Sequence, residues 1–234
     1  MTTHISRVAV IVCVAGCARG TVAPQAASTA TSREAAAHTA SPSVRTSTQA
    51  GSPGALAAFA SQPLVVLPVQ SLRLGIPAWS DKVGDHRAYL ASLDDEIAFA
   101  VREAGVRGKW AFPPALARAA RRNPSYAADP YAIAFDQLAP VEKEPDKAIA
   151  EPLAGQLRAL AALFDARHAL VPTVLRLTPE DSGGRATVHL VVVDVRAARL
   201  TWKGDVTGQM ARSFSPAVAA GLASGVADLF SPQR

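Results

Sequence analysis

Two cysteines near the start of the chain are the residues with the most evident chemical potential. Cys13 and Cys17 are the only cysteines among the 234 residues, and their close spacing could suit a redox pair or two metal ligands. However, they lie within and just after an apolar stretch from Val8 to about Ala15. This stretch is too short to span a bilayer, since a spanning helix needs about 20 apolar residues. It follows a polar start with one positive charge, Arg7, and is typical of a secretory signal peptide.

The residues Val14-Ala15-Gly16-Cys17 resemble the lipobox of bacterial lipoproteins, in which an aliphatic residue and two small residues precede an obligatory cysteine. The resemblance implies that residues 1–16 are cleaved off, that the Cys17 thiol is diacylated, and that the new amino terminus is acylated. Cys13 is then discarded, and Cys17 keeps no thiol for a disulfide, a metal or catalysis. Several acyl chains give a stable anchor, because a single chain binds a membrane only marginally.

The residues after the expected lipid anchor bear on where the protein lies. Ala18 stands where, in enterobacteria-like sorting, an aspartate favours the inner membrane, so we expect the outer membrane of a bacterial envelope, facing the periplasm. Residues 17–62 contain no Trp or Tyr and are dominated by Ala, Ser, Thr, Gly and Pro. Such a composition offers little apolar area to offset the entropy of ordering, which predicts a disordered tether. The foldable unit is then a single domain, residues 63–234.

Little else in the chain has the spacing that catalysis needs. Gly221-Leu-Ala-Ser224-Gly225 differs from the nucleophile elbow G-x-S-x-G, and it lies in an expected helix where small residues permit close packing. The histidines at 86, 168 and 189 have no partner at metal-ligand spacing. We expect His189 to be hydrogen-bonded within a strand, and Asp94-Asp95-Glu96 to lie on a solvated helix face. The sequence therefore predicts no enzyme, no metal and no cofactor.

Two features are candidate binding surfaces. Trp79 and Tyr89 flank a loop with glycine and proline, a kind of segment that often carries binding residues, and we interpret them as a partner-binding loop. Arg118, Arg121 and Arg122 form the densest basic patch, which solvent, anionic lipid headgroups or peptidoglycan carboxylates could face. Beyond residue 60 the chain holds 20 basic and 18 acidic residues, so nucleic-acid binding is not expected.

The elements that would position these groups follow an α/β (α+β) pattern. Apolar spacings of three and four predict helices over 86–104, 153–164 and 216–230, with shorter ones over 115–122 and 130–138. Aliphatic runs predict strands over 63–68, 109–112, 168–177, 185–195 and 200–208. The order is β-α-β-(α)-α-β-β-β-α, which predicts a mixed sheet ending in a three-stranded antiparallel meander. The run from Leu190 to Val193 is apolar on both faces, which suggests that helices cover one side of the sheet and something else covers the other.

Three segments resemble the TolB N-terminal and CsgG-like group of envelope proteins. Leu64-Val-Val-Leu-Pro-Val69 is similar to the opening strand, Phe164 to Val174 to a helix-to-strand passage, and Val188 to Trp202 to a hairpin with Asp194 in register. Ala197-Ala198 departs from the polar-Gly turn that is usual there, and residues 105–152 look like an insert. The resemblance implies a periplasmic interaction module.

The leading interpretation is therefore a lipid-anchored envelope protein that binds an envelope protein partner without catalysis. An accessory lipoprotein of an export or transport assembly is the alternative within the binding class. A hydrolase of envelope material is the alternative from another class, and it would need convergent polar residues at the strand ends.

Overall fold

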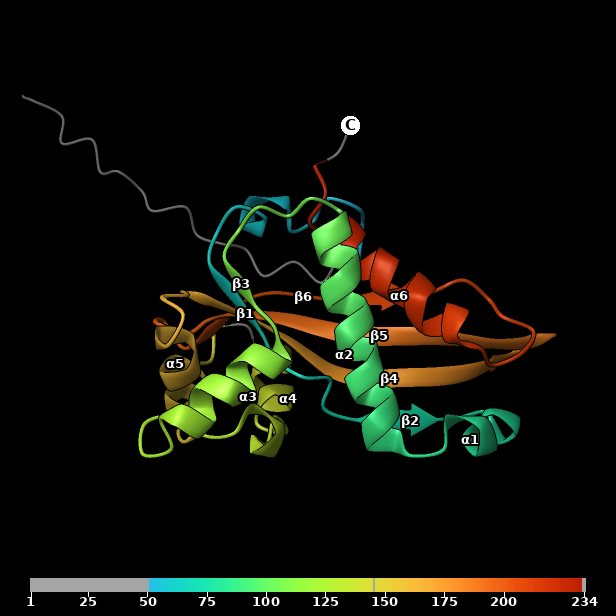
Figure 1. Cartoon of the computed structure of the whole chain (residues 1–234), viewed down its shortest axis with the longest axis horizontal. Coiled ribbons are helices and arrows are strands. Elements are labelled where there is room, and N and C mark those ends of the chain that lie inside the picture. The colour runs from blue at the N-terminus through green and yellow to red at the C-terminus, as the bar shows by residue number, and fades with distance from the viewer. Residues whose placement is uncertain (1–50, 145, 233–234) are drawn as a thin grey trace, which may run out of the picture. The chain divides into compact units, whose positions relative to one another are not determined.

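The computed structural model describes residues 51–144 and 146–232. Cys13, Cys17, the expected signal peptide and most of the expected tether lie outside the described residues. Within them, six strands form one sheet in the order β3-β1-β4-β5-β6, with β2 also paired to β4 (Figure 1). The strands are β1 (Leu64–Val66), β2 (Leu72–Leu74), β3 (Trp110–Ala111), β4 (His168–Glu180), β5 (Gly183–Asp194) and β6 (Arg199–Thr207).

Helices and short turns connect these strands. The helices are α1 (Pro77–Val83), α2 (His86–Glu103), α3 (Pro113–Arg122), α4 (Leu138–Lys143), α5 (Leu153–Ala162) and α6 (Pro216–Asp228), with 3-10 turns η1 (Ala57–Phe59) and η2 (Pro130–Ala132). None of the helices in the described segments is long and apolar enough to cross a membrane.

The sheet is mixed, as the sequence pattern predicts. β1 runs parallel to β3 and β4, β2 runs parallel to β4, and β4, β5 and β6 form an antiparallel meander. The α/β fold class and the C-terminal meander are therefore confirmed. Parallel strands need crossover connections, and here α2 links β1 to β3, while α3, α4 and α5 lie between β3 and β4 in the chain.

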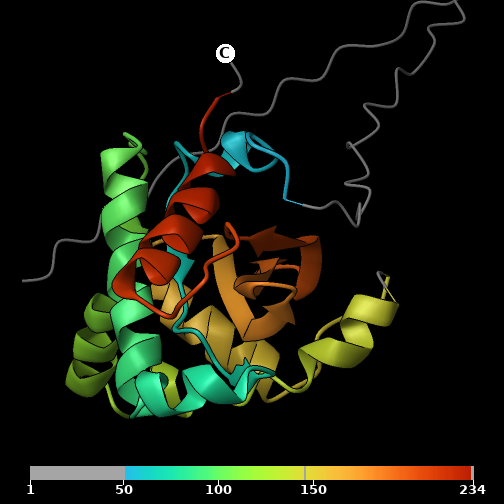
Figure 2. The same cartoon turned by 90° about the vertical axis from the view of Figure 1, so that its right-hand side faces the viewer.

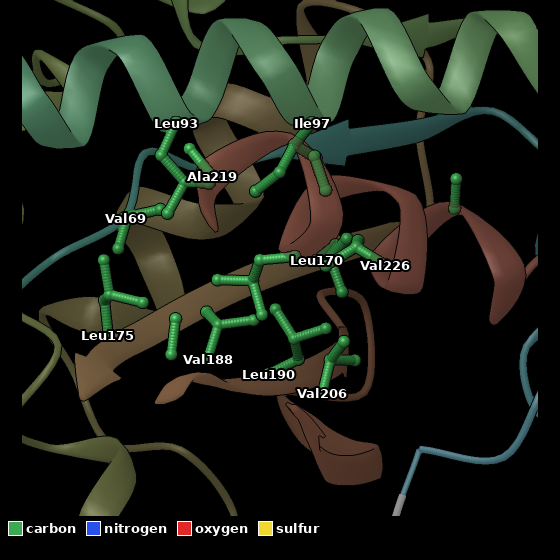
Figure 3. Packing of buried hydrophobic residues seen from close by; sticks show 14 of the residues in the cluster. Val69, Leu93, Ile97, Leu170, Leu175, Val188, Leu190, Val206, Ala219 and Val226 are labelled. Carbon is green, nitrogen blue, oxygen red and sulfur yellow. The ribbon is translucent and has the colours of Figure 1, made fainter. Parts of the chain in front are cut away.

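The helices cover the sheet in two separate apolar layers. Figure 2 shows α2 and α6 side by side against one face of the strands. In that layer Leu93 and Ile97 of α2 point toward Leu170 and Leu190 of the sheet, together with Val188 (Figure 3). The buried side chains of α3, α4 and α5 pack on the other face, against a second set from the same strands. Helices thus cover both faces of the sheet where its strands are apolar on both sides, whereas the sequence pattern suggested helices on one face only.

The structure corrects several expected boundaries. Residues 72–83, for which no helix or strand was expected, contain β2 and α1, because Pro77 starts a helix and Val83 is buried against the core. The helix expected over 130–138 is reduced to η2, where the Asp129 side chain accepts from the Tyr131 amide.

The fold also begins earlier than residue 63. Leu56 is buried, and its amide donates to the Leu229 carbonyl, so the residues from 51 onward pack on the domain. The expected tether can therefore extend at most to residue 50.

The turn between β5 and β6 places a non-glycine residue in the left-handed region. Asp194 holds this turn, because its Oδ1 accepts from the amides of Arg196 and Ala197. Ala198 has φ of 51°, a conformation in which a Cβ atom is unfavourable and a glycine is not. Ala198 stands where glycine is usual in the family that the turn resembles, and its backbone is therefore strained.

We expect Ala198→Gly to increase the free energy of unfolding by about 0.5 kcal/mol, since it relieves this strain at the cost of some unfolded-state entropy. The matched control is Ala197→Gly, which relieves no positive φ and should lower stability by a similar amount. Urea denaturation of both variants measures the two changes. Equal effects of the two substitutions would contradict the assignment of strain to Ala198.

Candidate functional site

The aromatic pair expected on a binding loop belongs to two helices instead, with Trp79 in the core and Tyr89 half-buried against it. Trp79 belongs to α1 and is only 4% exposed, and Tyr89 belongs to α2. Both rings contact Phe214, at 5.6 and 5.3 Å between ring centroids. The expectation of an exposed aromatic loop is therefore wrong, because α1 turns Trp79 inward onto the β4–β5 hairpin, where its ring packs beside Gly184.

The basic patch lies on a surface, as a solvated cluster would. Arg118, Arg121 and Arg122 are all exposed on α3, whose opposite face is buried. Two exposed tyrosines that the sequence interpretation did not single out follow them: Tyr126 is 56% exposed and Tyr131 is 40% exposed. We call these five residues the Arg–Tyr surface. Burial and nearby carboxylates raise the pKa of the Tyr131 hydroxyl, and Arg121 opposes this increase.

A groove runs along the uncovered half of the sheet beside this surface. On the groove side the strands carry polar side chains, while the side chains on the opposite face are apolar. The polar residues are Arg73, Arg176, Thr187, His189, Lys203, Asp205 and Thr207. The groove has a volume of about 680 Å³ and extends to Tyr131 and Glu142. It adjoins a smaller pocket of about 280 Å³ with which it shares Gln70, Ser71 and Tyr131. Together they form a continuous recess with many polar side chains.

His189 stands in this groove between two carboxylates. Its Nδ1 lies 2.5 Å from Asp205 Oδ1 on β6, and its Nε2 lies 2.9 Å from Glu142 Oε2 on α4. The hydrogen bond to Glu142 raises the pKa of His189, and Asp205 adds to this against the opposing effect of burial. Only the imidazolium can donate to both carboxylates at once. The expectation of a hydrogen-bonded histidine is confirmed, and the ring ties α4 to the sheet.

The neighbouring pocket holds a buried carboxyl that sequence reasoning had placed in solvent. Asp94 is only 4% exposed. Burial raises its pKa to about 7, in spite of a hydrogen bond from the Val69 amide, and Asp95 contributes to the increase. A signal was present in the sequence, because Asp94 precedes the buried Ala98 and Val101 at spacings of four and seven, which is one helix face.

The serine of the elbow-like sequence does not lie at a strand end, where the hydrolase alternative needs its polar residues. Ser224 lies in α6, where its hydroxyl donates to the Ala220 carbonyl. The adjacent Gly225 lets the helix approach β6, since a Cβ there would lie 2.9 Å from Val206. The described residues also contain no group of three or more potential metal ligands. The groove and the pocket are lined by charged groups of both signs.

No protein-family model matches the chain, and no curated protein matches it either. Three solved structures show limited similarity. The C-terminal domain of LpoB from Escherichia coli is 11% identical, with a TM-score of 0.33, over 63% of this chain and 82% of that one. The lipoprotein GNA1162 from Neisseria meningitidis is 15% identical, with a TM-score of 0.33, over 70% and 92%.

The PelC dodecamer from Paraburkholderia phytofirmans is 17% identical, with a TM-score of 0.35, over 78% of this chain and 95% of that one. The structures that this chain is similar to thus include a bacterial lipoprotein. TM-scores of this size establish neither a shared fold nor a shared activity, and the resemblance to the TolB N-terminal and CsgG-like group stays a prediction.

The carboxylate pair around His189 predicts that stability falls at alkaline pH. The pKa of His189 in the folded state is raised above the ordinary value of about 6.5. The stabilisation that His189 adds to the free energy of unfolding is therefore complete below a pH of about 6.5, and it is lost as the pH rises through the folded-state pKa. We expect His189→Gln to remove this pH-dependent part, about 1.5–3 kcal/mol as for a hydrogen bond to a charged group.

Unfolding free energies of the wild type and the variant between pH 6 and 9 measure this difference. His86→Gln is the control, because His86 is exposed on α2. A wild type and a His189→Gln variant with parallel pH profiles would show that the imidazolium does not hold α4.

Proposed function

We propose that this chain is a lipid-anchored protein of the bacterial cell envelope whose α/β domain binds another envelope protein and does not catalyse a reaction. The anchor is Cys17, and the membrane is the outer one, with the domain in the periplasm. The observation that carries the binding role is the Arg–Tyr surface on α3 and the segment that follows it. The lipobox-like motif supports the location.

Exposed tyrosines beside arginines favour binding to another protein. Tyr126 and Tyr131 keep large ring surfaces in water, and arginine and tyrosine are among the residues that contribute most to binding energy at protein interfaces. The cluster belongs to the insert-like region, 105–152, rather than to the sheet, so it adds a surface to the fold without contributing to the strand framework.

The alternative within the same class is an accessory role in an export or transport assembly. This role also requires that a protein binds the Arg–Tyr surface, and it differs only in the identity of that protein. The hydrolase alternative is favoured by no arrangement of the described residues.

The anchor predicts a difference between the two cysteines. Palmitate labelling of the wild type and of Cys13→Ala should be equal, because Cys13 belongs to the segment that is cleaved off. Cys17→Ala should lose the label and accumulate as the uncleaved form. Labelled Cys17→Ala, or a mature amino terminus at any residue other than Cys17, would contradict the lipoprotein assignment.

The binding surface predicts where a partner can be trapped. A photo-crosslinking amino acid placed at Tyr126 or Tyr131 should capture one defined envelope protein in living cells. Phe99 is the matched control position, since it is an aromatic residue 60% exposed on α2, beside α6 rather than α3.

Charge reversal should weaken this capture. Arg121→Glu with Arg122→Glu should reduce the crosslink about tenfold or more, as for the loss of central interface arginines. Arg107→Glu, a reversal at an exposed arginine in the loop after α2, should leave it unchanged. Equal capture from Phe99, or recovery of unrelated envelope proteins alone, would refute a specific partner on this surface.

A further inference from the structure

Two arginines on neighbouring strands line the groove at paired positions. In the parallel register of β2 and β4, Arg73 lies opposite Arg176, and both side chains line the groove. Neighbouring strands are about 4.8 Å apart, so the two side chains extend from adjacent points of the sheet. Like charges that lie opposite each other on a sheet repel and destabilise it. The pair is therefore stabilised by any negative charge that approaches both arginines.

The protein supplies only part of that negative charge. Arg176 Nη1 lies 3.8 Å from Asp205 Oδ1, but His189 Nδ1 lies closer to the same oxygen, at 2.5 Å, so this carboxylate is shared. Arg73 forms no ion pair with any of the described residues. Positive charge is thus in excess on the β2 side of the groove.

Both arginines can be reached from solvent. Arg73 is exposed, and the Arg176 side chain is 37% exposed. A ligand that enters the groove can therefore contact both guanidinium groups without any rearrangement of the core.

An arginine pair of this kind favours a phosphate monoester over a carboxylate. Each guanidinium presents a planar fork of N–H donors, and the two oxygens of a carboxylate are filled by one such fork. A phosphate monoester has three terminal oxygens and a charge of about −1.5 to −2 at neutral pH, so it can accept from two forks at once. Its charge also balances that of the two arginines.

The remainder of the groove suits a ligand that carries hydroxyl groups. Its volume of about 680 Å³ is more than a phosphate group fills and lies in the range of small-molecule sites. Beyond the arginines, its polar lining includes Gln70, Ser71, Tyr131, Asp136 and Glu142. The two carboxylates accept hydrogen bonds from hydroxyl groups and repel a phosphate, so they direct the phosphate toward the arginines.

We propose that this groove binds a sugar phosphate. The phosphate pairs with Arg73 and Arg176 on the floor of the sheet, and a sugar hydroxyl donates to the exposed carboxylate of Asp136. This site goes beyond the proposed function, since it needs no protein partner.

The test uses glucose 6-phosphate and inorganic phosphate as probes, with binding to the full chain measured by titration calorimetry. Both should bind saturably, and glucose 6-phosphate should bind more tightly. Arg73→Gln should weaken both at least about tenfold, as for the loss of a charge-assisted hydrogen bond. Arg73→Lys keeps the charge but not the fork, and it should also weaken both.

The matched control is a third arginine on the same face of the sheet. Arg185 pairs with Glu180 at 2.8 Å, so Arg185→Gln should bind both probes as the wild type does. Asp136→Asn should reduce the preference for glucose 6-phosphate without weakening inorganic phosphate. Arg73→Gln should also raise the Tm of the protein without phosphate, because it removes the repulsion with Arg176.

Equal affinity of Arg73→Gln and the wild type, or no saturable binding of either probe, would overturn the proposal. Binding to phosphatidate vesicles that depends on Arg73, without binding of glucose 6-phosphate, would also overturn it, because the arginines would then contact a lipid surface. Loss of the partner crosslink from Tyr126 with glucose 6-phosphate binding intact would bear on the proposed function alone.

Discussion

Strand β5 has apolar side chains on both faces of the sheet, and the remaining architecture follows from covering them. Val188, Leu190 and Val192 face the layer of α2 and α6, while Val191 and Val193 face the layer of α3, α4 and α5. Each fully buried side chain of this size contributes about 1.5–3 kcal/mol relative to exposure, so a sheet covered on only one side would leave a large apolar surface in water. The two crossover segments between parallel strands supply the helices for both faces.

Helices α3, α4 and α5 cover only part of their face of the sheet, and the groove around His189 lies on the part that they leave uncovered. Where α5 no longer covers the strands, the outward positions carry threonines and charged residues in place of valines. These groups must pair with one another in a half-buried setting, which explains why His189 bridges Asp205 and Glu142 and why the Lys203 ammonium donates to the Glu142 carbonyl. Helix α4 is thus held by polar contacts at one end and by Leu138 and Val141 beneath it.

Sequence reasoning located the long elements because their periodicity is strong. The helices over α2, α5 and α6, and the meander of β4, β5 and β6, follow directly from spacings of three and four or from β-rich runs. It failed between residues 72 and 83 and between 130 and 138, where segments are short. A three-residue strand such as β2 carries no measurable period, and it forms only because β4 offers it a partner.

Among the candidate site residues, the sequence likewise predicts the exposure of some and not of others. The exposed state of Arg118, Arg121 and Arg122 was predictable, since three arginines on a short amphipathic helix must face water. Trp79 was misplaced, because a tryptophan beside glycine and proline is compatible with a loop as well as with the helix that buries it. Asp94 was misplaced because a carboxylate is rarely buried, and only the approach of the Val69 amide and Tyr131 from distant parts of the chain encloses it.

The class of fold and the need to cover both faces of the sheet follow from the sequence alone, which also predicts a lipid anchor at Cys17. These inferences depend on local sequence patterns, which can be interpreted without knowing which distant residues come into contact. Only the tertiary structure decided which polar groups meet. It brings Glu142 to His189 across 47 positions and Asp94 to Val69 across 25, because contacts at such separations depend on how helices cross a sheet and not on any local spacing.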